Sequence, residues 1–311
     1  MLKSDNMSII VDLNCIEDIF KKDLELLSED KGGLGSVEYL YPPKTIQDST
    51  TSILIRNKKN KKIAVLLCAR SEYSKNIERN VVNAEKAKRL VSGDNILDPL
   101  FYQEKEGISC AAWPYCEPLS ENSLLGPIQR RIITPSILKW LSDLTKNSLK
   151  KTSYEEQQND FLIPLENFAS NNKIDKEMSI AINKAIDNYQ KKSWIPQFVL
   201  AHNDLRKCNI LHGLARGSSF TVIDWAGANF NGYAIYDFVC ISSSLNISPE
   251  KFIRELREHC KILECDIKDS ISYLLASLAN LGMNLECFPE ENYLNLVKYT
   301  TGYLFSRILT K

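Results

Sequence analysis

Residues 202–211 read HNDLRKCNIL, and residues 221–225 read TVIDW. The first segment has the form HxDxxxxN and follows a short apolar run at 198–201; the second is an apolar run that ends at Asp224. Two short strands, at 209–212 and 220–223, are expected to form a hairpin between the motifs. Because adjacent strand ends lie together, Asn209 and Asp224 are expected to face one point.

These residue types suit phosphoryl transfer, which requires few protein groups. One carboxylate orients the attacking hydroxyl and accepts its proton, while oxygen ligands hold Mg²⁺ across the phosphates. Mg²⁺ takes few protein oxygens and keeps water and phosphate oxygens for its remaining positions. In chain order, Asp204 is therefore the candidate catalytic base, and Asn209 and Asp224 are the candidate Mg²⁺ ligands.

HNDLRKCNIL and the segment VIDWAGANFNGYAIYDF at 222–238 resemble the catalytic and metal-binding segments of the aminoglycoside phosphotransferase and choline/ethanolamine kinase families. The resemblance extends in order over most of the chain. It implies the same roles for Asp204, Asn209 and Asp224, with His202 and Asp237 as structural supports of the catalytic loop.

The resemblance also implies an α+β, two-lobed protein-kinase-like fold. An N-terminal nucleotide-binding lobe at 1–112 is expected to be an antiparallel sheet with one helix. A larger, mainly helical lobe at 113–311 is expected to hold the catalytic loop and the substrate. Apolar patterning agrees with this order, since it predicts strands at 36–41, 52–55, 63–69, 99–102 and 108–113, and helices at 76–91, 136–147, 176–192 and from 249 onward.

The sequence has neither a complete GxGxxG phosphate loop nor a lysine within the expected third strand. A glycine-rich phosphate loop at 31–37 is one possibility, and a hydroxyl-rich loop at 47–51, between the first two strands of the sheet, is the register that we favour. The fold normally carries a lysine on its third strand, but IAVLLCAR has none, so Arg70 is the candidate. Glu85 resembles the helix glutamate that pairs with that cation, and Trp113 and Tyr115 flank the expected adenine hinge.

Composition limits the partners of the chain. Lysine plus arginine and aspartate plus glutamate both number 39, so no global field favours nucleic acid or an anionic membrane. The N-terminal twenty residues lack a signal-peptide pattern, and no apolar stretch is long enough to cross a bilayer. Nine scattered cysteines without a CxxC pair suit a reducing compartment. A cytoplasmic protein without membrane insertion or nucleic-acid binding is expected.

The expected activity is transfer of the γ-phosphate of ATP or GTP, with Mg²⁺, to a hydroxyl of a small metabolite such as a sugar, an amino alcohol or an aminoglycoside. A protein kinase is disfavoured because only 12 residues separate Asp224 from Asp237 and no APE follows. A pseudokinase that binds nucleotide or acts as a scaffold is the alternative, since the strand lysine is absent.

The acceptor is left open. Aromatic residues could form a box for a quaternary ammonium, and acidic residues could form a groove for an aminoglycoside. The candidates for the box are Trp225, Tyr233 and Tyr236, and those for the groove are Glu286, Glu290 and Glu291.

Overall fold

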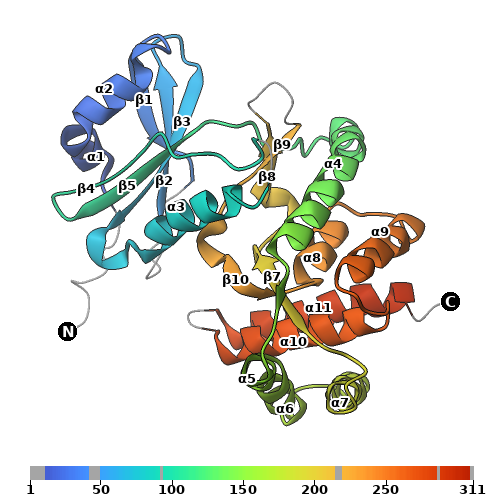
Figure 1. Ribbon diagram of the computed structural model, residues 1–311. Coiled ribbons are helices and arrows are strands. Elements are labelled where there is room, and N and C mark those ends of the chain that lie inside the picture. The colour runs from blue at the N-terminus through green and yellow to red at the C-terminus, as the bar shows by residue number, and fades with distance from the viewer. Residues whose placement is uncertain (1–10, 42–49, 92–93, 214–218, 286–287, 309–311) are drawn as a thin grey trace. The chain divides into compact units, whose positions relative to one another are not determined.

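The computed structural model describes residues 11–41, 50–91, 94–213, 219–285 and 288–308 (Figure 1). These residues form two compact units. The first is drawn from Met1–Leu119 and Ile210–Gly227, and the second from Ser120–Asn209 and Ala228–Lys311. The chain therefore returns to its first unit for one short segment, the hairpin between the two motifs.

The first unit contains an antiparallel sheet of five strands in the order β1-β2-β3-β5-β4. Short apolar runs separated by polar turns produce these strands, and all five were expected from the sequence. Their bounds are β1 (Leu34–Tyr39), β2 (Thr51–Asn57), β3 (Lys62–Arg70), β4 (Phe101–Lys105) and β5 (Ile108–Pro114).

Alternate side chains of this sheet enter two separate cores, because successive residues of a strand point to opposite faces. One face carries Ile53, Leu66 and Cys110, which pack with α1 (Leu13–Ile19) and α2 (Lys21–Glu29). The other face carries Leu67 and Ala111, which pack with α3 (Lys75–Lys88).

The two helices that precede the sheet correct the expectation that strands open the molecule and that the lobe has one helix. Asp12 caps α1 by accepting the backbone N–H of Asn14. Ile16, Phe20 and Leu24, each four residues apart, are fully buried against the sheet. This spacing is the helical signal that was missed, and it is weak because α1 has only seven residues.

The returning hairpin consists of β8 (Ile210–His212) and β9 (Phe220–Val222). These two strands form the hairpin expected from the sequence, and in it Ile210 pairs with Val222. Its two outer edges bond to the rest of the first unit: the His212 N–H donates to the Glu117 carbonyl at 2.9 Å, and the Val222 N–H donates to the Asn95 carbonyl at 2.7 Å. The segment leading to Asp224 is thereby anchored within the first unit.

The second unit is mainly helical and has a three-stranded sheet, β10-β7-β6. Among the described residues, no helix combines the length and apolar character required to cross a membrane. The strands are β6 (Lys150–Lys151), β7 (Gln197–Ala201) and β10 (Asn229–Tyr233), and the helices are α4 (Leu125–Ser148), α5 (Tyr154–Gln157), α6 (Ile163–Ala169), α7 (Lys176–Gln190), α8 (Tyr236–Ser244), α9 (Pro249–Ile262), α10 (Asp269–Met283) and α11 (Glu290–Ile308).

Helix α4 begins at Leu125, 11 residues before the expected start at 136, and Pro135 lies inside the helix. Proline removes one backbone donor from a helix interior. Immediately before it, the Thr134 hydroxyl bonds to the Arg130 carbonyl at 2.5 Å.

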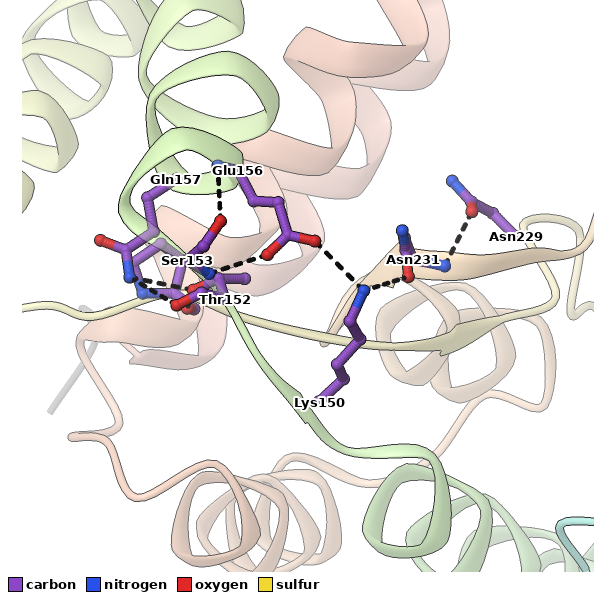
Figure 2. A network of polar contacts seen from close by, with 8 residues as sticks. Lys150, Thr152, Ser153, Glu156, Gln157, Asn229 and Asn231 are labelled. Atoms are coloured by element: carbon purple, nitrogen blue, oxygen red, sulfur yellow. Dashed lines mark hydrogen bonds and ion pairs between the residues drawn. The ribbon is translucent and has the colours of Figure 1, made fainter.

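A polar network ties β6 to β10 and α5 in the second unit (Figure 2). Lys150 Nζ lies 3.1 Å from Glu156 Oε1 and 3.2 Å from Asn231 Oδ1. Glu156 also accepts the backbone N–H of Ser153, whose hydroxyl accepts the Glu156 N–H, so the two residues form a capping box for α5. This network holds the small sheet whose strand β7 leads directly into the HxDxxxxN loop.

Candidate active site

Strand β7 ends at Ala201, and the loop that follows carries Asp204, which is half exposed. Asn209 donates from Nδ2 to the Asp204 carbonyl at 2.8 Å and to its carboxylate Oδ2 at 2.9 Å. Arg206 approaches the other carboxylate oxygen, with Nε 3.1 Å from Oδ1. The second unit thus brings together Asp204 and Asn209 from the sequence motif, and adds Arg206.

Arg206 is a site residue that sequence reasoning missed. Its only signal was a cation two residues after Asp204, and that spacing does not show that the side chain turns back to the carboxylate. The next residue, Lys207, points elsewhere and forms a bidentate ion pair with Glu121 at 2.7 and 2.9 Å.

Asp237, at the start of α8, is buried beneath the loop and binds its backbone. Its carboxylate accepts the N–H of His202 at 2.5 Å and of Asn203 at 3.0 Å, and it also receives a backbone hydrogen bond from Leu205. His202 is fully buried and accepts the Asp204 N–H at Nδ1, 3.3 Å away. Asp237 and His202 therefore both hold the backbone of the loop through buried hydrogen bonds.

The backbone around this loop is strained at two residues. Asn203 has φ +66°, and Ile235, directly before α8, has φ +77°. A β-branched residue rarely adopts the left-handed region, so Ile235 is held there by its surroundings. Because Asp237 accepts the N–H groups of His202 and of Asn203 itself, its carboxylate holds the backbone in place on the N-terminal side of the strained residue.

Removal from water raises the pKa of both carboxylates, Asp204 and Asp237. Desolvation raises the pKa of Asp204, while the Arg206 charge and the Asn209 hydrogen bond oppose that rise. For Asp237, burial raises the pKa to about 7 against the backbone N–H groups of His202, Asn203 and Leu205, which favour the ionised form.

Replacing Asp237 by alanine is expected to destabilise the protein by roughly 3–5 kcal/mol, because three buried backbone donors lose their shared acceptor. Thermal and denaturant unfolding measure this loss. The matched control is Asp187→Ala, which removes an exposed partner of Lys191 and is expected to cost less than about 0.5 kcal/mol. Equal effects of the two substitutions would show that Asp237 is not a structural support.

Asp224 belongs to the first unit, two residues beyond β9, and has φ +64°. The structure thus divides the motif residues: Asp204, Asn209, His202 and Asp237 lie in the second unit, while Asp224 follows the hairpin of the first. Within the first unit, Ile210, the residue that follows Asn209 in the chain, pairs with Val222.

Arg70 is exposed at the end of β3, where Cys68 pairs with Thr51, the first residue of β2. It therefore lies at the end of the sheet where β1 leads into β2. The favoured phosphate-loop register at 47–51 occupies that connection, but residues 42–49 lie outside the described part of the chain.

The glycines at 32–35 lie at the opposite end of the same strands. Gly33 accepts the Lys58 N–H at 3.1 Å, and a Cβ on Gly35 would come within 2.2 Å of the Asn57 carbonyl. These glycines therefore allow β1 to approach the turn between β2 and β3.

The other expected nucleotide residues have local partners. Glu85, on α3, pairs at 2.5 Å with Arg89, the residue that directly follows this helix, and not with a strand cation. Trp113 packs partly buried on the α3 side of the sheet. The Tyr115 hydroxyl accepts from Lys62 Nζ at 2.7 Å and donates to Glu117 at 3.0 Å, while its N–H bonds to the Ile63 carbonyl.

The residues considered for acceptor binding are mostly buried or paired with other side chains of the protein. Trp225, Tyr233 and Tyr236 are 1%, 5% and 3% exposed, so these side chains belong to the core and do not form an open aromatic box. Glu290 pairs with Lys173 at 2.6 Å, and Glu291 is exposed on α11. Glu286 lies outside the described residues.

Comparison with solved structures supports the fold at low sequence identity. An aminoglycoside 2′-phosphotransferase of type IIIa in its GDP complex is 13% identical; the match covers 92% of this chain and 96% of that one, with a TM-score of 0.52. A macrolide 2′-phosphotransferase from Brachybacterium faecium is 12% identical, with 93% and 98% coverage and a TM-score of 0.52. No protein-family model and no curated protein matches the chain in sequence. The protein-kinase-like α+β fold expected from the motifs is confirmed.

Proposed function

We propose that this chain is a small-molecule kinase that transfers the γ-phosphate of ATP or GTP to an acceptor hydroxyl. The observation that carries the proposal is the loop in which Asn209 and Arg206 hold the two oxygens of Asp204. A carboxylate held at both oxygens presents a defined surface to an incoming hydroxyl. The shared fold with two solved phosphotransferases supports the same reaction class.

In the proposed reaction, Asp204 orients the acceptor hydroxyl and takes its proton. The acceptor oxygen forms a bond to the γ-phosphorus as the bond from that phosphorus to the bridging oxygen of the nucleoside diphosphate breaks. The diphosphate leaves, and Asp204 returns its proton to solvent. Arg206 stabilises the ionised form of the base.

Asn209 and Asp224 are the proposed Mg²⁺ ligands. The donor set fits a hard cation: Nδ2 of Asn209 is engaged with Asp204, so its Oδ1 is the atom left to act as a ligand, and Asp224 supplies a carboxylate. Bound Mg²⁺ would neutralise phosphate charge as the transfer proceeds. His202 and Asp237 are proposed to keep the loop in its reactive conformation.

On the nucleotide side, we propose that the hydroxyl-rich segment at 47–51 is the phosphate loop, although residues 42–49 lie outside the described part of the chain, and that Arg70 contributes a positive charge to the phosphates. The pairing of Cys68 with Thr51, which brings the end of β3 to the start of β2, supports the assignment of Arg70. Trp113 and Tyr115 are proposed to flank the base, and Glu85 keeps only a local helix contact in the described structure.

A magnesium-dependent nucleotide-consumption assay across aminoglycosides, macrolides, choline, ethanolamine and common sugars tests the proposal. Diphosphate release that requires both Mg²⁺ and one class of acceptor is the expected result, and it would also identify that class. Tight nucleotide binding without nucleotide consumption across this panel would instead support a pseudokinase. The observation in favour of that alternative is that Glu85 pairs with Arg89 and not with a strand cation.

Arg206→Gln is expected to move the acidic limb of the kcat/KM pH profile to higher pH. Asp204 must be ionised to accept a proton, so activity falls as the pH drops through its pKa. Since Arg206 lowers that pKa, its removal raises the pKa, and protonation begins at higher pH. Lys207→Gln is the control, because Lys207 pairs with Glu121. An unmoved limb in Arg206→Gln would contradict the coupling.

A further inference from the structure

Trp225, the residue directly after Asp224, is held at three polar points within the first unit. Its N–H donates to Asn80 Oδ1 at 3.0 Å, its carbonyl accepts from Asn83 Nδ2 at 3.1 Å, and its indole Nε1–H donates to the Val222 carbonyl at 3.2 Å. The Trp225 side chain is 1% exposed. Two of these three bonds come from one helix, α3, more than 140 residues earlier in the chain.

Asn80 and Asn83 reach the same residue because side chains three positions apart lie on one side of a helix. Asn80 is 7% exposed, although asparagine is a poor helix former and a buried amide is costly unless it is hydrogen-bonded. The bond to Trp225 compensates for that cost. Glu85 is exposed on the same helix and pairs with Arg89.

The bond from Asn80 acts on the conformation of Asp224 itself. The Trp225 N–H belongs to the same rigid peptide plane as the Asp224 carbonyl. Asn80 therefore fixes the plane that follows Asp224, whose φ of +64° needs support from its surroundings. Asn83 fixes the next peptide plane by holding the Trp225 carbonyl.

We propose that Asn80 and Asn83 are positioning residues that clamp Trp225 and thereby hold the Asp224 carboxylate in place for Mg²⁺. The catalytic consequence of this inference rests on the proposed function. In this chain the asparagine pair connects α3 to the segment that carries Asp224, whereas the only role that the sequence suggested for this helix was pairing of Glu85 with a strand cation.

Hydrogen–deuterium exchange tests the clamp without any assay of activity. In Asn80→Ala, exchange of the Trp225 amide is expected to rise at least tenfold relative to wild type, because its acceptor is gone. Arg79→Ala is the matched control, since Arg79 is exposed on the same helix, and it should leave exchange at Trp225 unchanged. Equal exchange at Trp225 in wild type and Asn80→Ala would overturn the clamp.

Asn83→Asp provides a second variant that keeps the size of the side chain and replaces the donor with an acceptor facing the Trp225 carbonyl. The Mg²⁺ concentration for half-maximal activity is expected to rise roughly tenfold in Asn83→Asp and Asn80→Ala, the range for residues that orient a metal ligand. Excess Mg²⁺ should restore turnover, and the KM for the acceptor should not change. A merely structural loss would lower activity at every Mg²⁺ concentration, and that result would refute the positioning role.

The exchange measurement and the activity measurement together distinguish failure of the clamp from failure of the proposed function. If wild type transfers no phosphate but Trp225 exchange rises in Asn80→Ala, the proposed function fails and the clamp stands. If wild type is active and neither exchange nor Mg²⁺ dependence changes in the variants, the clamp fails and the kinase stands.

Discussion

Turnover of the Asp204→Asn variant is expected to be lower than that of wild type by a factor of about 10²–10⁴, the usual contribution of a positioned general base. The amide has the shape of the carboxylate but cannot accept the proton of the acceptor hydroxyl. Its NH₂ group must also face one of two donors, Asn209 Nδ2 or Arg206 Nε, because these approach opposite oxygens of Asp204.

The substitution is expected to leave nucleotide affinity within about threefold of wild type, because Asp204 orients the acceptor and not the nucleotide. Steady-state kinetics and calorimetric nucleotide titration measure the two quantities. Asp187→Asn is a suitable control, as its exposed carboxylate pairs only locally with Lys191. Turnover of Asp204→Asn within twofold of wild type would exclude Asp204 as the base.

The second large effect is expected at Asp224. Asp224→Asn should lower Mg²⁺-dependent turnover by more than about 100-fold, since losing even an outer-sphere partner of a metal ligand costs 10–100-fold. Asparagine is chosen because it tolerates the left-handed backbone of Asp224, with φ +64°. The loss of activity in Asp224→Asn therefore results from the missing negative charge and not from a strained backbone.

Asp224→Ala is expected to show the same catalytic loss together with an added destabilisation of about 1–2 kcal/mol, because alanine is disfavoured at that φ. Comparing the two variants by kinetics over a Mg²⁺ series and by thermal unfolding separates ligand loss from backbone strain. Asp98→Asn is the control within the same unit, since Asp98 is exposed and pairs with Lys88. Full activity of Asp224→Asn at ordinary Mg²⁺ would rule out Asp224 as a ligand.

Local patterning was sufficient for the sheet of the first unit and for the hairpin between the motifs. Each strand is a short apolar run between polar turns, so its signal lies within a few residues. Helices α1 and α2 were not predicted because each is short. Their apolar residues Ile16, Phe20 and Leu24 are buried only because they pack against the sheet. The periodic pattern at 136–147 gave only the later part of α4, which begins at Leu125 and contains Pro135.

The sequence by itself determined the order of Asp204, Asn209 and Asp224, because the spacing of a loop, a hairpin and a strand end is a local property of the chain, and the resemblance of its motifs to known kinases implied the fold class. Only the tertiary structure decided what surrounds them. Asp237 bonds the loop from 34 and 35 residues away, and Asn80 and Asn83 reach Trp225 from 145 and 142 residues away. Such bonds depend on which elements pack together, and packing arises from burial across the whole unit, which no local pattern records.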